Sequence, residues 1–104
     1  MQVKYKFSRD SISILLCGEL DEHSAKEVRE EIDEVLEDNR ELLKSVIFDL
    51  SSLSFMDSTG IGVLIGRYKK IKSFNGKTYV QSPSISIEKI LKLSGIYNII
   101  PKIS

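Results

Sequence analysis

Short apolar segments alternate with amphipathic helical segments along nearly the whole chain. Residues 45–50 (SVIFDL) form a continuous apolar run, which is typical of a central strand covered on both faces. From about residue 58 to 71, apolar side chains recur three and four residues apart, which is the spacing of one helix face. Because strands separated by helices pair in parallel through right-handed crossovers, this pattern predicts an α/β domain with a mostly parallel sheet.

The segments before this pair predict an N-terminal β-hairpin followed by a helix. Residues 3–7 alternate apolar and basic side chains, and residues 12–17 form a second apolar segment after a polar turn. Apolar residues at spacings of three and four between positions 25 and 36 predict an amphipathic helix that packs on the sheet. Asp21 or Ser24 is expected to cap the start of this helix.

The segments after it predict one more strand and helix and then a closing strand. Residues 78–80 (TYV) favour a strand, and the Ser-Pro pair at 82–83 suits the first turn of a helix. Gly95 is expected to end that helix, and residues 96–100 (IYNII) to form a closing edge strand. The expected order is β-β-α-β-α-β-α-β in one domain, residues 1–104.

Composition excludes several classes of protein. Fifteen basic and fifteen acidic residues cancel to a formal net charge of zero, so no direct binding to nucleic acid is expected. No apolar run approaches the ~20 residues that cross a bilayer, and the first residues lack a signal-peptide pattern, so we expect no membrane contact and a cytoplasmic location. Cys17 is the only cysteine, which excludes an internal disulfide and a cysteine-rich metal site. We expect no metal and no cofactor.

Charge is balanced over the whole chain but not along it. Residues 19–41 contain eleven acidic and three basic residues, whereas the chain from Arg67 onward contains eight basic residues and one acidic residue. The simpler interpretation is one solvated acidic helix and one solvated basic helix. The functional alternative is a polar molecule whose two ends meet different partners, and the sequence leaves both open.

The segment best suited to carry chemistry is LSFMDSTGIG, residues 53–62, between the central strand and the second helix. In α/β proteins the carboxyl end of a parallel strand is where ligands and reactive groups are placed. The unpaired N–H groups of the following helical turn favour an anion there. The polar and small residues of this segment that we single out are Asp57, Ser58, Thr59, Gly60 and Gly62.

Several interpretations of this segment compete. In the simplest, its polar residues only cap the helix. A phosphate-binding loop is disfavoured because no Gly-Lys-Ser/Thr sequence is present. A serine hydrolase is disfavoured because Met56 stands where the nucleophile elbow needs glycine, and because His23 is the only imidazole. The remaining possibility is that the Ser58 hydroxyl receives a phosphate from another protein, which adds about −1.5 to −2 charges. The chain itself would then not be an enzyme.

Three segments together resemble a known family. They are SFMDSTGIGVLIGRYKKI (54–71), GELD (18–21) and LSGI (93–96). They resemble the bacterial anti-sigma factor antagonists, which belong to the STAS domain family, and most of all the subgroup that controls the first forespore sigma factor of sporulation. The long central segment is the specific part of the resemblance. The family usually carries one more C-terminal helix, which is expected to be short or missing here.

The resemblance implies a partner switch in transcription regulation. The serine that is phosphorylated in the family corresponds to Ser58. An anti-sigma factor with serine kinase activity phosphorylates it, and a PP2C-type phosphatase reverses the step. The unphosphorylated antagonist binds the anti-sigma factor and releases the sigma factor, whereas the phosphoprotein does not. The alternative is a paralogous antagonist in a general-stress pathway. The expected partner-binding residues are Asp21, Glu22, His23, Asp57, Ser58, Thr59, Gly60 and Gly62.

Overall fold

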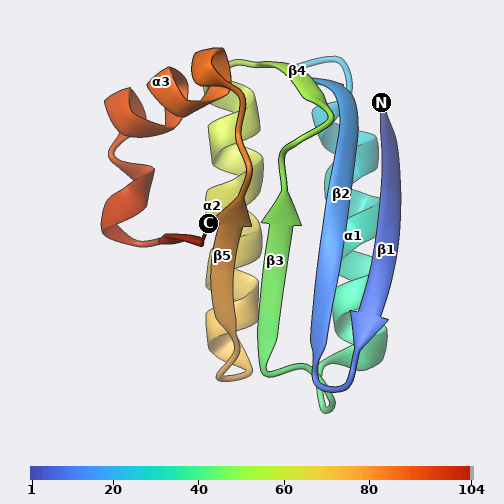
Figure 1. Ribbon diagram of the computed structural model, residues 1–104. Helices are drawn as coiled ribbons and strands as arrows, with labels where there is room; N and C mark the ends of the chain where they lie inside the picture. The colour runs from blue at the N-terminus through green and yellow to red at the C-terminus, as the bar shows by residue number, and fades with distance from the viewer. Residues whose placement is uncertain (104) are drawn as a thin grey trace.

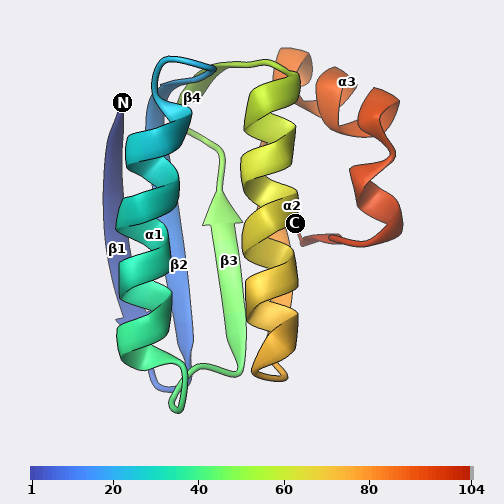
Figure 2. The same ribbon diagram turned by 180° about the vertical axis from the view of Figure 1, so that it is seen from behind.

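The computed structural model describes residues 1–103 as a mixed sheet with two long helices on one face (Figures 1 and 2). The strands are β1 (Gln2–Ser8), β2 (Ser11–Leu20), β3 (Ser45–Asp49), β4 (Leu53–Met56), β5 (Lys77–Gln81) and β6 (Lys102–Ile103). The helices are α1 (Ala25–Asn39), α2 (Ser58–Ser73) and α3 (Ile85–Ser94), and a 3-10 turn, η1 (Ile96–Asn98), follows α3.

The strand order is β1-β2-β3-β5-β6, and β4 pairs with the end of β2. β1 and β2 form an antiparallel hairpin, and the other neighbouring strands pair in parallel. The hairpin and the mostly parallel sheet that the sequence predicts are therefore confirmed. β4 is an additional short strand that was not predicted, because only four residues form it and they pair beside the main sheet path.

The core lies between the sheet and the pair of helices α1 and α2. Ile12, Ile14 and Leu16 of β2 point toward the helices and are fully buried, and Phe48 of the adjacent β3 joins them. Full burial of one such side chain contributes roughly 1.5–3 kcal/mol relative to exposure. Residues of both helices complete this cluster: Ala25, Val28, Ile32 and Leu36 of α1, and Ile61, Val63, Leu64 and Ile71 of α2.

The prediction that residues 45–50 are covered on both faces is wrong. Val46 and Phe48 face α1 and α2 and are buried, whereas Ile47 and Asp49 lie on the opposite face and are half-buried. Figures 1 and 2 show that α1 and α2 lie on the same face of the sheet and leave the other face open. The apolar run at residues 45–50 suggested burial on both faces because Ile47 is apolar too. Ile47 lies on the open face, where neighbouring strands cover it only in part.

The closing strand predicted at residues 96–100 is also wrong. The segment turns as η1 instead, because Ile96 and Ile100 are both buried and the N–H of Ile100 donates to the carbonyl of Ile96 at 2.8 Å. Asn98, midway between these two residues, is exposed, so the segment lacks the alternation of a strand, in which residues i, i+2 and i+4 share a face. The closing strand, β6, follows Pro101, whose carbonyl accepts a hydrogen bond from the N–H of Val80 at 3.1 Å.

The start of α3 differs from the prediction, whereas its end agrees with it. Ser84 caps the helix, since its hydroxyl accepts a hydrogen bond from the N–H of Ile87 at 3.3 Å. The Ser-Pro pair at 82–83 precedes the helix, because Ser82 has a φ of 54° and an N-cap needs an extended backbone. Gly95 ends α3 with a left-handed φ of 76°, as predicted.

Glu88 of α3 binds two side chains of the C-terminal segment, and these contacts make the stability of the fold depend on pH. Its carboxylate accepts hydrogen bonds from the Tyr97 hydroxyl at 2.5 Å and from Lys102 Nζ at 3.0 Å. The Tyr97 bond, and then the Lys102 bond, hold the pKa of Glu88 below its ordinary value. The stabilisation is therefore complete above the unfolded-state pKa and is lost as the pH falls through the folded-state pKa.

We expect Glu88→Gln to reduce the acid sensitivity of the fold. The amide keeps the shape of the side chain but carries no negative charge at any pH. The variant therefore already lacks, at neutral pH, the stability that the wild type loses when Glu88 is protonated. Thermal melting followed by circular dichroism between pH 7 and pH 3 measures this. The Tm of the variant should fall less over this range than that of the wild type. An identical fall in both proteins would show that the negative charge of Glu88 adds no stability.

Candidate functional site

Three connections meet at one end of the molecule. In parallel strands the carboxyl ends lie at the same edge of the sheet, so the segments that follow β2, β4 and β5 gather there (upper end in Figure 1). These segments are residues 21–24, 57–60 and 82–85, and we call their exposed side the carboxyl-end surface. α2 packs against both α1 and α3. The start of α2 therefore lies between the segment that leads into α1 (21–24) and the segment that leads into α3 (82–85).

Ser58 is the first residue of α2, and its side chain is exposed. The helix is capped by Asp57, which has an extended backbone and whose Oδ1 accepts a hydrogen bond from the N–H of Gly60 at 3.1 Å. The predicted capping role of Asp57 is therefore confirmed. Because Asp57 makes the cap, the Ser58 hydroxyl is left accessible to a second molecule. Thr59 is half-buried beside it.

The two glycines of this turn differ in their surroundings. Gly60 is buried, and a Cβ placed on it would lie 2.5 Å from Met56 Cγ and 2.7 Å from the backbone oxygen of Leu20. Its lack of a side chain lets α2 pack against the ends of β2 and β4. Gly62 is exposed, and a Cβ there would meet no atom within 4 Å. A partner contact at either glycine stays a prediction, and only Gly62 offers an open surface for one.

The loop after β2 is organised by Asp21. Its Oδ1 accepts hydrogen bonds from the N–H groups of His23 at 2.9 Å and Ser24 at 3.1 Å. The bond from Ser24, helped by that from His23, holds the pKa of the Asp21 carboxyl below its ordinary value. Ser24 occupies the N-cap position of α1 without making a side-chain cap, since its hydroxyl donates to the carbonyl of Glu19 at 2.8 Å. Glu22 and His23 are exposed beside this turn.

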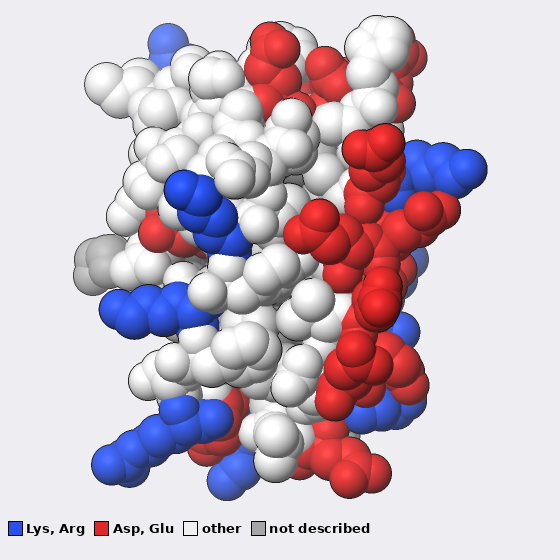
Figure 3. All heavy atoms as spheres, turned by 90° about the vertical axis from the view of Figure 1, so that its right-hand side faces the viewer, with Lys and Arg blue, Asp and Glu red and all other residues white. Residues whose placement is uncertain are grey.

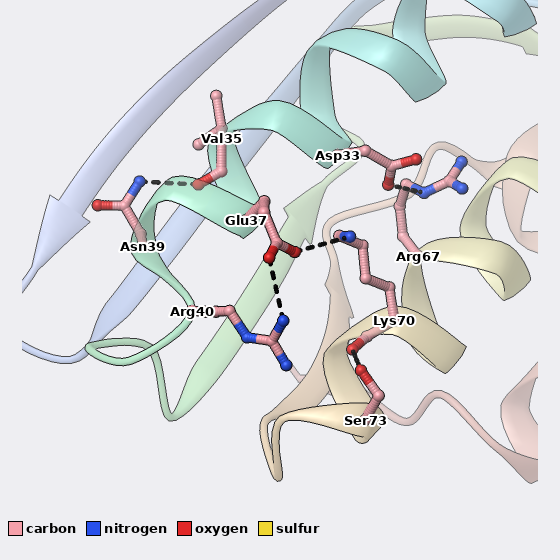
Figure 4. A network of polar contacts seen from close by, with 8 residues as sticks. All are labelled: Asp33, Val35, Glu37, Asn39, Arg40, Arg67, Lys70 and Ser73. Carbon is pink, nitrogen blue, oxygen red and sulfur yellow. Dashed lines mark hydrogen bonds and ion pairs between the residues drawn. The ribbon is translucent and has the colours of Figure 1, made fainter.

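The acidic residues predicted from the charge pattern lie along one side of the molecule. Figure 3 shows them as a stripe, and its exposed members on α1 are Glu27, Glu30, Glu31, Glu34, Glu37 and Asp38. Two contacts join α1 to basic residues of α2 (Figure 4): Arg67 Nε lies 2.8 Å from Asp33 Oδ1, and Lys70 Nζ lies 3.1 Å from Glu37 Oε2. Part of the charge asymmetry along the chain is thus neutralised by packing.

Two exposed apolar side chains that were not predicted from the sequence lie in or directly before the segments of the carboxyl-end surface. Phe55, on β4, is 46% exposed, and Ile85, the first residue of α3, is 81% exposed. The burial pattern of β4 leaves Ser54 and Phe55 exposed between buried Leu53 and Met56. The exposure of Ile85 could have been predicted from the sequence. Ile87 and Leu91 are four residues apart and define the buried face of the helix, and Ile85 falls outside this face.

Metal binding and membrane spanning find no support in the part of the chain that the structure describes. Within residues 1–103, no three His, Cys, Asp or Glu side chains are arranged to hold a metal ion. None of the helices there is both long enough and apolar enough to cross a membrane.

Residues 4–104 match the profile of the STAS domain family. The chain belongs to this family. This STAS domain is 34% identical over 101 residues to the anti-sigma F factor antagonist of Paenibacillus polymyxa, covering 97% of this chain and 85% of that protein. It is 29% identical over 100 residues to the anti-sigma-B factor antagonist of Bacillus subtilis, covering 96% of this chain and 88% of that protein.

Solved structures of STAS proteins have the same fold. The anti-sigma factor antagonist SpoIIAA in its unphosphorylated form matches with a TM-score of 0.82 and 27% identity, over 99% of this chain and 89% of that one. The Bacillus cell fate determinant SpoIIAA in the phosphorylated form matches with a TM-score of 0.72 and 27% identity, over 99% of this chain and 92% of that one. The resemblance and the fold class predicted from the sequence are confirmed.

Proposed function

We propose that this STAS domain is an anti-sigma factor antagonist that works as a phosphorylation-controlled binding switch. Without phosphate it binds an anti-sigma factor that is also a serine kinase, and the sigma factor is released. A phosphate on Ser58 prevents this binding, and a PP2C-type phosphatase restores it. The switch acts in the cytoplasm, and the chain is a substrate and binding protein rather than an enzyme.

One observation carries the proposal: the Ser58 hydroxyl is exposed at the first turn of α2 while its neighbour, Asp57, makes the helix cap. A hydroxyl that the fold does not use can be modified without loss of structure. The similarity to antagonists named for anti-sigma F and anti-sigma-B factors supports the class of partner. The match to SpoIIAA in a phosphorylated form supports the type of control.

The energetics favour a change in binding over a change in fold. An anion at an exposed helix start is favourable by about 0.3–1 kcal/mol, so the phosphate leaves the free domain intact. In a complex the phosphate must lose its water next to Asp57 and near the acidic loop at Asp21 and Glu22. A mispaired charge buried in an interface costs about 2–5 kcal/mol, which is large enough to switch binding off.

The alternative is an antagonist in a general-stress pathway, which uses the same serine with different partners. The identity to the anti-sigma F factor antagonist is 34%, against 29% for the anti-sigma-B factor antagonist, and this favours the sporulation pathway. A binding comparison between anti-sigma F and anti-sigma-B factors separates the two.

Asp57 has two possible roles, in the helix cap and in orienting the hydroxyl toward the ATP of the kinase. We expect Asp57→Ala to cost about 1 kcal/mol of stability because the cap is lost, and Asp57→Asn to retain the cap. If the carboxylate also orients Ser58, Asp57→Asn will be phosphorylated more slowly than the wild type at equal stability. Urea denaturation and initial rates of phosphorylation measure the two effects. A normal rate for Asp57→Asn would leave the helix cap as its only role.

The proposed function is tested by incubating the chain with candidate anti-sigma factor kinases and labelled ATP. Mass spectrometry then locates the modified residue. We expect a single phosphate on Ser58, and Ser58→Ala provides the matched control that takes up no label. Phosphate on Thr59 instead, or no transfer with any anti-sigma factor that binds the chain, would contradict the proposal.

A further inference from the structure

We propose that Phe55 and Ile85 are the apolar contacts through which this STAS domain binds its anti-sigma factor, and that they keep the contact around Ser58 dry. The proposal rests on the proposed function and adds the chemistry of the partner. That partner presents an apolar surface next to basic side chains, which meet the acidic loop at Asp21 and Glu22.

Both side chains are exposed although apolar neighbours in the same elements are buried. Ile85 is 81% exposed although Ile87 and Leu91 of the same helix are fully packed against the core. Phe55 is 46% exposed, and its strand partner on β2 is Glu19, which is also exposed. Single exposed apolar residues are ordinary, but a group of them at a functional surface marks an interaction site.

Their position in the fold ties both residues to Ser58. Phe55 precedes Ser58 by three residues, and α3 packs against both β4 and α2. Figures 1 and 2 agree that the first turn of α3, which begins with Ile85, lies beside the first turn of α2. Phe55 and Ile85 therefore belong to segments that adjoin the Ser58 turn, and the β2–β4 pairing brings the acidic loop to the same turn.

Apolar contacts at this place would also strengthen the switch. In protein interfaces a few anchoring side chains contribute most of the affinity, and the contacts around them exclude water. A phosphate that remains hydrated in a complex costs little, whereas one enclosed by a dry contact loses its hydration. Phe55 and Ile85 thus contribute in two ways, by increasing affinity and by making the charge on residue 58 harder to accommodate.

The experiment compares serine substitutions of exposed apolar residues near Ser58 with the same substitution of similarly exposed residues at the other end of the molecule. Phe55→Ser and Ile85→Ser alter the carboxyl-end surface. Their controls are Phe7→Ser (54% exposed) and Leu42→Ser (68% exposed), which lie at the opposite end, where β1 ends and β3 is about to begin. Isothermal titration calorimetry measures the Kd of each chain for the anti-sigma factor that binds the wild type. Thermal melts monitor folding.

We expect each surface variant to raise the Kd by about 10-fold and each control to leave it within about 2-fold. Ser58→Asp in the Ile85→Ser background should weaken binding by a smaller factor than in the wild type, because the contact is no longer dry. If Phe55→Ser unfolds, the Ile85→Ser variant still tests the proposal, because a residue as exposed as Ile85 tolerates serine.

Three outcomes would overturn the inference. The first is an unchanged Kd for Ile85→Ser while Ser58→Asp does not bind. The second is an equal loss in the controls. The third is a dimer of this chain, detected by sedimentation, that Ile85→Ser abolishes without changing the Kd. A wild-type chain that binds no anti-sigma factor would instead overturn the proposed function, and this result is distinguishable from the other three.

Discussion

Replacing Ser58 with aspartate is expected to weaken binding to the anti-sigma factor by roughly 30- to 4,000-fold, whereas alanine leaves the affinity near the wild-type value. Alanine removes only an exposed hydroxyl that the helix cap does not use. Aspartate places a permanent negative charge at the start of α2, beside Asp57 and near the acidic loop. In the complex that charge is desolvated without a partner.

Titration of the two variants with the same anti-sigma factor measures the difference in Kd. The free Ser58→Asp variant should melt at or above the Tm of the wild type, because a negative charge in the first turn of a helix is favourable by about 0.3–1 kcal/mol. A Ser58→Asp chain that bound as tightly as Ser58→Ala would show that charge at this position does not control the complex. A Ser58→Asp chain that unfolded would show that phosphorylation acts through the fold.

The same substitution, glycine to alanine, is expected to have opposite effects at two positions in α2. Gly60→Ala should destabilise the domain by about 1–3 kcal/mol, which is the usual cost of overpacking. The new Cβ would lie 2.5 Å from Met56 Cγ and 2.7 Å from the Leu20 backbone oxygen. Met56 can move aside, but the backbone oxygen is held in the β2–β4 pairing. Gly62→Ala should stabilise by up to about 1 kcal/mol through helix propensity, since its Cβ meets open space.

Urea denaturation of the two variants and the wild type measures both changes in the free energy of unfolding. For a domain of this size about 1 kcal/mol corresponds to roughly 4–8 °C in Tm, so thermal melts detect either sign. A Gly60→Ala domain as stable as the wild type would show that α2 can shift away from the sheet at no cost. If Gly62→Ala is more stable yet binds the anti-sigma factor more weakly, the partner approaches the backbone of α2 closely.

Much of this protein is predictable from local patterns. A period of two predicted the hairpin, and periods of three to four predicted α1 and α2. Short apolar segments predicted β3 and β5, and the Ser-Pro pair and Gly95 predicted α3. Asp57 was predicted as a possible cap and Ser58 as a hydroxyl that receives a phosphate, because the chemistry of a strand-to-helix turn depends on residues next to one another in the sequence. The long segment at 54–71 identified the family for the same reason. These features need only short-range backbone geometry and side-chain spacing.

Other features were decided when distant segments packed together. The open face of the sheet depends on where the helices cross, and the burial of Gly60 depends on Leu20, forty positions earlier. Arg67 is buried and paired with Asp33 of α1, whereas sequence alone treats it as one more surface charge. Whether a side chain is covered is a property of all its neighbours in space, and no periodicity within one segment contains that information. That is why the apolar residues beside Ser58 became visible only in the folded molecule.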